Sequence, residues 1–140
     1  MNFLHEQGLK VTLNLHPALG IRSFENCYDA AARAMGLDTA EKKPIEFDIT
    51  DTRFINTYFD TAHHPYEDEG VDFWWIDWQQ GKKSKLPGLD PLWALNHYHY
   101  LDRQRSGKRP LILSRYAGIG SHRYPLGFSE IGRASCRERV

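Results

Sequence analysis

The sequence predicts an α/β fold built around a parallel sheet. Apolar extended segments alternate with segments of helical pattern, in the order strand, helix, helix, strand, helix, strand. This alternation favours parallel strands joined by helical crossovers. The last strand segment, "RPLILSR", is almost continuously apolar, which is typical of strands covered on both faces. A length of 140 residues fits one ordinary domain.

The first strand is predicted in "LKVTLNLHP". Val11, Leu13 and Leu15 alternate with polar residues, so the apolar side chains share one face, and Pro17 ends the run. The polar residues Lys10, Thr12, Asn14 and His16 lie on the other face.

Two helices are expected before the second strand. "ENCYDAAARAMGLD" is rich in alanine, and its Gly36 stands where a helix commonly ends. A short extended piece is predicted in "PIEFD". Asp51 can cap the next helix, and Pro65 is predicted to end it, with a turn after it. The apolar stripe of this helix, at helical spacing, consists of Phe54, Ile55, Tyr58, Phe59 and Ala62.

The second strand is predicted in "VDFWWID", and the clearest helix follows in "LPGLDPLWALNHYHYLDRQRSG". Asp90 is a good N-cap, Pro91 suits the first helical position, and Gly107 is expected to stop the helix. Its apolar side chains recur at a spacing of three, at Leu92, Leu95, Tyr98 and Leu101. The third strand, "RPLILSR", comes next.

The composition argues against two classes of partner. Lys+Arg and Asp+Glu both number 18, so no basic excess suggests nucleic acid and no basic stripe suggests a membrane surface. No apolar run approaches the ~18–20 residues needed to cross a bilayer. With 41% hydrophobic and 26% charged residues, the composition is that of a soluble globular protein.

The last eleven residues differ from what precedes them. "EIGRASCRERV" has neither turn chemistry nor apolar rhythm and matches a common sequencing adapter in translation, so we expect residues 130–140 to be non-native. Cys27 is then the only native cysteine, which excludes a disulfide and favours a core thiol. Three strands alone would leave both sheet edges open. We therefore interpret the chain as an internal piece of a larger α/β protein.

Polar residues follow each predicted strand directly. His16, Asp77 and Arg115 stand at the carboxyl ends of the three strands, where parallel α/β folds gather reactive groups. Trp75 and Trp78 could form an apolar wall beside Asp77. The aromatic surroundings disfavour a charged carboxylate, whereas a nearby arginine favours it. A structural role for Asp77, as a helix cap or as the partner of a buried arginine, remains an equal alternative from spacing alone.

Histidine pairs suggest a metal site only weakly. "HYHY" contains His97 and His99, and "AHHPY" contains His63 and His64. A His-x-His pair shares a face on a strand, but on a helix the two side chains point apart. Because the segment after Asp90 is predicted to be helical, we expect no metal there.

Three stretches carry a resemblance to a known family. "VDFWWIDWQQG", "LDPLWALNHYHYLD" and "RPLILSRYAGIGSHRYPLGFS" together resemble glycoside hydrolase family 31, the α-glucosidase and α-xylosidase family. The resemblance implies an α/β fold of the (β/α)8 TIM-barrel type. Residues 1–129 are then expected to form a partial catalytic barrel, about three strands with their helices.

The resemblance also implies roles for individual residues. Asp77 falls on the catalytic nucleophile. Trp75 and Trp78 fall on positions that line the pocket for the cleaved sugar, Arg115 on the arginine that binds this sugar, and Phe128 on an aromatic just before the acid/base. The implied partner is an oligosaccharide or another glycoside, and no cofactor or metal is implied.

The sequence departs from the family in three places. His16 stands where many members have an aspartate, so it receives no role. "WQQG" replaces the commoner "DMNE" after the nucleophile, which leaves the sugar open. Glu130 and Ile131 stand where the family has Gly-Asp, whose aspartate is the general acid/base.

The implied mechanism is retaining hydrolysis, in which two carboxylates about 5–5.5 Å apart act as nucleophile and as acid/base. Because the acid/base is missing, the isolated chain is expected to be inactive. Two other hypotheses stay open: a non-catalytic carbohydrate-binding relative that keeps the aromatic pocket, and a metal-dependent barrel hydrolase.

Overall fold

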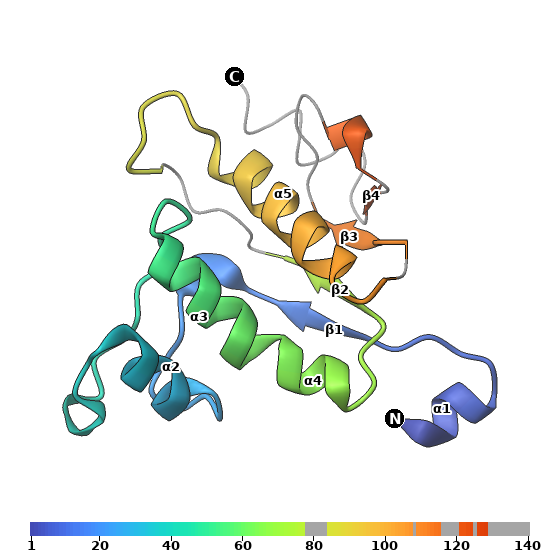
Figure 1. Ribbon diagram of the computed structural model, residues 1–140, viewed down its shortest axis with the longest axis horizontal. Coiled ribbons are helices and arrows are strands. Elements are labelled where there is room, and N and C mark those ends of the chain that lie inside the picture. Colours follow the sequence, from blue (N-terminus) through green and yellow to red (C-terminus); the bar gives the residue numbers. More distant parts are fainter. Residues whose placement is uncertain (78–83, 108, 116–120, 125, 129–140) are drawn as a thin grey trace.

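A computed structural model describes residues 1–77, 84–107, 109–115, 121–124 and 126–128. Its centre is a sheet with the strand order β1-β2-β3-β4, in which every pair of neighbours is parallel (Figure 1). The strands span β1 Thr12–Leu15, β2 Phe73–Ile76, β3 Ile112–Ser114 and β4 Leu126–Phe128. The α/β class, the parallel sheet and the three predicted strands are confirmed.

The fourth strand, β4, was not predicted. It has only three residues and carries Gly127 in its middle, and glycine weakens a strand signal. The structure gives this glycine a packing reason, because a Cβ added to it would lie 3.3 Å from Leu113 Cδ1 on the neighbouring strand. Gly127 therefore makes room for a β3 side chain.

The helices largely lie where the sequence pattern predicts them, and the predicted helix caps are present. The Asp51 carboxylate accepts from the Arg53 backbone N–H at 2.8 Å, and that of Asp90 accepts from the Leu92 N–H at 2.9 Å. Gly36 closes its helix in the left-handed conformation. The helices span α1 Asn2–Glu6, α2 Tyr28–Met35, α3 Thr52–Ala62, α4 His64–Asp68 and α5 Pro91–Gln104. The short piece predicted to be extended contains Ile45, which forms an isolated antiparallel bridge to Ile21 that was not predicted.

The turn predicted after Pro65 was wrong for residues 66–68 and is confirmed only at Glu69 and Gly70. Residues 64–68 form the separate helix α4, which follows α3 directly (Figure 1). Pro65 sits in the first turn of α4, where a proline lacks only an N–H that has no intrahelical partner anyway. A proline that ends one helix can thus begin the next one.

One face of the sheet is buried under the helices. Trp74, Ile76 and Ile112 point into a core shared with α2, α3 and α5. The predicted apolar face of β1 is confirmed, since Leu13 and Leu15 pack against the same core. Among the described helices, none combines the length and apolarity needed to cross a bilayer.

The apolar stripe of α5 differs from the predicted spacing of three. Leu92 and Leu95 are buried, but Leu101 is 44% exposed. Nine residues turn an α-helix by about 900°, which leaves Leu101 on the side opposite Leu92. The inward positions are taken by Asn96 and His99 instead, each 1% exposed.

Gly20 offers a stability test with a matched control. It has φ +68°, and a Cβ added there would overlap the carbonyl oxygen of Ile45, whereas Gly88 has φ +79° and no atom within 4 Å of the added Cβ. We expect Gly88→Ala to cost about 1 kcal/mol from backbone strain alone, and Gly20→Ala to cost at least about 2 kcal/mol more, because its clash is with backbone. Urea unfolding checks this; equal losses would show that the Ile45 contact relaxes freely.

Candidate active site

The three predicted strand ends meet at one edge of the sheet. The parallel register continues one residue beyond the strands, because the Asp77 N–H donates to the Leu15 carbonyl at 2.8 Å and the Arg115 N–H donates to the Ile76 carbonyl at 2.9 Å. His16, Asp77 and Arg115 therefore follow equivalent positions on β1, β2 and β3. We call these three residues the strand-end row.

The side chains of the strand-end row contact one another. Arg115 Nη1 donates to Asp77 Oδ1 at 2.8 Å, and His16 Nε2 lies 3.6 Å from Asp77 Oδ2. The Asp77 side chain is 15% exposed, that of Arg115 21% and that of His16 42%. A cation at hydrogen-bond distance favours the ionised carboxylate in such a partly buried place. The predicted proximity of Asp77 to Arg115 is confirmed; the contact with His16 was not predicted.

The tryptophans of β2 divide between its two faces. Trp74 is 3% exposed in the core, and its indole N–H donates to Glu67 Oε1 at 2.8 Å. Trp75 is half-buried, and alternation along a strand puts it on the face that also carries Asp77. Trp75 is therefore the described tryptophan placed to border the strand-end row.

Two predicted site residues are described only in part or not at all. Trp78 lies outside the described residues. Phe128 belongs to β4, where its backbone is in register with Ser114, but its side chain lies outside what the structure describes.

His63 and His99, one from each histidine pair of the sequence, contact each other in the core. Nε2 of His63, at the end of α3, lies 3.1 Å from Nε2 of His99 in α5, and both rings are fully buried. The Nδ1 atoms face the carbonyls of Tyr58 and Leu95. Burial lowers the pKa of both, that of His99 to about 4, and the neighbouring His99 lowers that of His63 further. Within the described ranges, no group of three or more His, Cys, Asp or Glu side chains could hold a metal ion.

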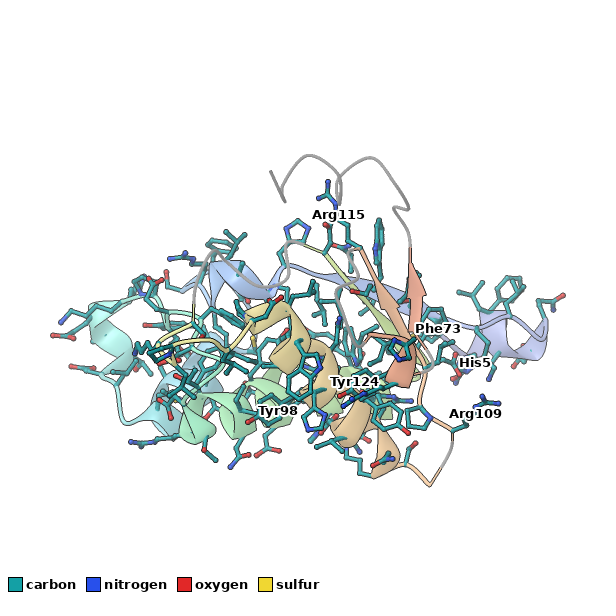
Figure 2. All side chains as sticks on the ribbon, turned by 90° about the horizontal axis from the view of Figure 1, so that it is seen from above. His5, Phe73, Tyr98, Arg109, Arg115 and Tyr124 are labelled. Carbon is teal, nitrogen blue, oxygen red and sulfur yellow. The ribbon has the colours of Figure 1, made fainter. Side chains whose placement is uncertain are left out.

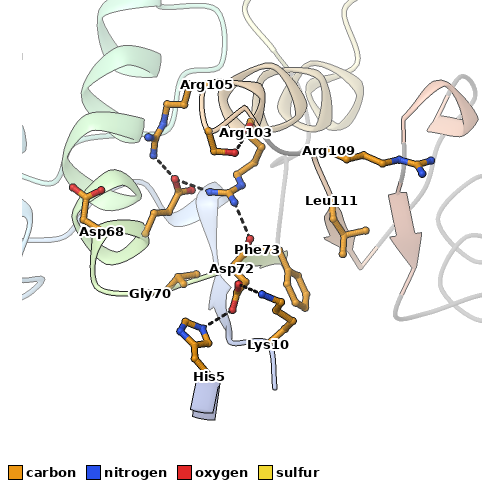
Figure 3. A pocket seen from close by; sticks show the side chains of 13 residues that line it. His5, Lys10, Asp68, Gly70, Asp72, Phe73, Arg103, Arg105, Arg109 and Leu111 are labelled. Carbon is orange, nitrogen blue, oxygen red and sulfur yellow. Dashed lines mark hydrogen bonds and ion pairs between the residues drawn. The ribbon is translucent and has the colours of Figure 1, made fainter. Parts of the chain in front are cut away.

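The opposite end of the strands carries a charged cavity of about 410 Å³. There His5 and Lys10 bind the Asp72 carboxylate at 2.8 and 2.9 Å, and Arg103 and Arg105 bind Glu67 (Figure 3). Figure 2 shows Arg115 at one end of the sheet, away from His5 and Arg109.

This cavity differs from the strand-end row in its position, at the amino ends of the strands. Burial alone would raise the pKa of Asp72, but the Val11 N–H, Lys10 and His5 together lower it to about 2. Asp72 and Glu67 of this cavity are thus each held by two basic side chains. In parallel α/β folds such pairing at the amino ends of strands serves stability, whereas the carboxyl ends carry chemistry. The strand-end row is therefore the candidate active site.

The comparisons with known proteins identify the family of the chain. A family model described as "Glycosyl hydrolases family 31 TIM-barrel domain" matches residues 1–135. No curated protein matches the chain. The match accounts for the strand order β1-β2-β3-β4, in which parallel strands neighbour each other in sequence order. A (β/α)8 barrel is built by repeating such strands with helices between them. The four described strands thus form part of such a barrel.

Proposed function

The chain belongs to glycosyl hydrolases family 31, and on that premise we propose that Asp77 is the nucleophile of a retaining α-glycosidase that cleaves terminal α-linked sugars. The observation that carries the proposal is the Arg115–Asp77 contact of 2.8 Å at the carboxyl end of β2. A nucleophilic carboxylate must be ionised before it attacks, and a guanidinium at this distance favours that state.

The reaction follows from two carboxylates on opposite sides of the scissile bond. Asp77 attacks the anomeric carbon, and the glycosyl–oxygen bond breaks as a second carboxylic acid protonates the leaving oxygen. The resulting ester on Asp77 is then hydrolysed by a water that the second group deprotonates. The sugar returns with its original anomeric configuration, because each of the two displacements inverts it.

The aromatic residues are assigned to substrate binding. Trp75 shares its strand face with Asp77, so its ring is placed to contact the sugar that Asp77 attacks. Trp78 and Phe128 are assigned to the same pocket through the family resemblance alone. Flat apolar rings suit the C–H faces of a pyranose and exclude water from the reacting carbon.

Covalent trapping tests the proposed function. The complete protein that carries this barrel is incubated with a fluorinated α-glycosyl fluoride, which forms the ester quickly and releases it slowly. We expect one sugar per molecule, on the peptide that contains Asp77 by mass spectrometry, and α-configured product from an aryl α-glucoside by proton NMR. A β-configured product would refute a retaining mechanism. Sugar binding with neither adduct nor turnover would support the carbohydrate-binding alternative.

The isolated 140-residue chain is proposed to be inactive. The family resemblance puts Gly-Asp after Ser129, with the acid/base at the second of these positions, where this sequence has Glu130 and Ile131. Loss of general acid catalysis alone costs about 10²–10⁴-fold. We expect no hydrolysis of an aryl α-glucoside above a buffer blank, and turnover by the pure chain would contradict this.

A further inference from the structure

The connection between β3 and β4 differs from the two earlier connections of the sheet. Helices lie between β1 and β2 and between β2 and β3. Residues 115–125 join β3 to β4, and the described part of this stretch contains one 3-10 turn, Ser121–Arg123. Parallel strands normally need a crossover of about a dozen residues or more, usually a helix that packs on the sheet. The position of β4 therefore depends on what holds this short connection in place.

Tyr124 ties the connection to α5. Its hydroxyl oxygen lies 2.8 Å from Nδ1 of His97, a hydrogen-bond distance, and both side chains are half-buried (Figure 2). The His97 ring stacks on Trp93, with centroids 5.1 Å apart and planes 10° apart. The Tyr124 ring also contacts that of Tyr100, at 5.0 Å. Trp93, His97 and Tyr100 recur at helical spacing, so Tyr124 packs on one flank of α5, beside the helix face that covers the sheet.

The strand β4 has few features of its own that fix its register. It spans three residues and pairs with β3, and its middle residue, Gly127, adds no side chain to either face. Register is weakly specified in strands rich in glycine, and a slip of one residue shifts the chain by about 3.3 Å and turns every side chain to the opposite face. A single residue separates Tyr124 from Leu126. The contacts of Tyr124 therefore act directly at the start of the strand.

We propose that Tyr124 is a positioning residue, whose hydrogen bond to His97 holds β4 in register with β3 and thereby fixes the place of the residues that follow β4 in the complete protein. The inference rests on the proposed function, which puts the acid/base at the second position after Ser129. Retaining hydrolysis requires this group at about 5–5.5 Å from the nucleophile. Because a displacement of about 1 Å can cost about 10²-fold in rate, a slip of β4 would disable the acid/base.

The two catalytic groups depend on β4 to different degrees. Asp77 directly follows β2, which is paired on both sides with β1 and β3, so loosening of β4 leaves the nucleophile in place. The acid/base follows β4 and moves with it. Its proton goes to the glycosidic oxygen as the bond to the anomeric carbon breaks, so a poor leaving group needs it, whereas fluoride leaves without a proton. Loss of the Tyr124 contact therefore slows glycosides and spares glycosyl fluorides.

The first experiment measures kcat/KM of the complete protein on phenyl α-glucoside and on α-glucosyl fluoride. Tyr124→Phe keeps the ring and removes the hydroxyl. We expect it to lose about 10- to 100-fold on the phenyl glucoside and less than about threefold on the fluoride. Tyr98→Phe is the matched control, since it removes the hydroxyl of another half-buried tyrosine, in α5 itself, and it should keep both rates. Equal losses of Tyr124→Phe on the two substrates, or no loss on either, would overturn the proposal.

The other partner of the hydrogen bond supplies a second comparison. His97→Phe keeps a ring on Trp93 and removes the nitrogen, so it should reproduce the selective loss of Tyr124→Phe. The double variant should be no worse than either single one, because both remove the same contact. His97→Asn puts an amide group near the place of Nδ1 and should recover most of the rate. Normal rates in His97→Phe would contradict a role for the hydrogen bond.

Hydrogen exchange tests the anchoring without turnover. Amide exchange of the peptide that contains β4 is followed by mass spectrometry in the complete protein and in Tyr124→Phe. We expect exchange at Leu126–Phe128 to become about fivefold faster, since one hydrogen bond near the strand is lost. The peptides of β1 and β2 should keep their rates. Unchanged exchange of β4 would refute the anchoring.

The outcomes separate this inference from the proposed function. If covalent trapping marks Asp77 while Tyr124→Phe slows both substrates alike, the function stands and the positioning role is refuted. If trapping fails at Asp77 while exchange of β4 rises in Tyr124→Phe, the nucleophile assignment fails and the anchoring of β4 by Tyr124 remains.

Discussion

Replacing Asp77 with alanine is expected to abolish turnover by the complete protein while leaving sugar binding intact. Removal of a catalytic nucleophile costs on the order of 10⁴–10⁶ in kcat, because the remaining groups cannot form the ester. The measurement is kcat on an aryl α-glucoside, together with the Kd of a non-hydrolysable sugar by calorimetry. We expect the Kd to change by less than about fivefold, since Trp75 and Arg115 remain in place.

Asp72→Ala is the matched control for this change. Both aspartates flank β2, and each pairs with a histidine and a second base. Asp72→Ala should destabilise the fold, because the Val11 N–H loses its acceptor, yet it should retain normal kcat below its lowered melting temperature. Parallel loss of sugar binding and stability in Asp77→Ala would identify Asp77 as a structural residue and would contradict the proposed function.

The second large effect concerns stability in acid. Burial holds the pKa of His63 well below its ordinary value of 6.5 and that of His99 at about 4. In the unfolded chain both histidines bind protons below about pH 6.5, whereas in the folded protein they bind them only at lower pH. A fall in pH therefore favours the unfolded state. The stabilisation is complete above about pH 6.5 and is lost as the pH falls towards 4; for His99 alone it is on the order of 3 kcal/mol.

The contribution of this pair is measured as a difference between variants. Urea unfolding at a series of pH values is compared for the unchanged protein and for the double variant His63→Phe/His99→Leu. The double variant should have a flatter dependence on pH between 7 and 4, whatever its stability at pH 7. His122→Gln, at an exposed position, controls for removal of a histidine and should keep the original slope. Identical slopes in all three proteins would show that the folded pair takes up protons freely.

The fold was predictable where its signals are local in sequence. Asp51 and Asp90 mark helix starts because a carboxylate reaches only the nearby backbone N–H groups. The alternation in β1 needs no more than the period of a strand. β4 was missed because Gly127 carries no apolar side chain, and its reason for being glycine is Leu113, a residue of another strand. Leu101 was wrongly aligned with the buried stripe because a spacing of three drifts around a helix.

The candidate site was predictable for a different reason. The carboxyl ends of parallel strands must meet at one edge, so Asp77 and Arg115 could be brought together without knowing any helix packing. The meeting of His63 with His99 could not be predicted, because it depends on how the end of α3 packs against α5. The sequence suggested only that each belonged to a histidine-rich stretch. The roles assigned to Trp75, Trp78, Arg115 and Phe128 stay predictions.

The register of β1, β2 and β3 has a consequence for the nascent protein. The Arg115–Asp77 contact joins residues separated by 38 positions, so Asp77 acquires this arginine contact only when β3 docks beside β2. Before that step, β2 can pair with β1, whose end carries His16 within 3.6 Å of the Asp77 carboxylate. The chemistry proposed for Asp77 therefore requires completion of this part of the sheet, and a chain that stalls after β2 lacks the Arg115–Asp77 contact on which the proposal rests.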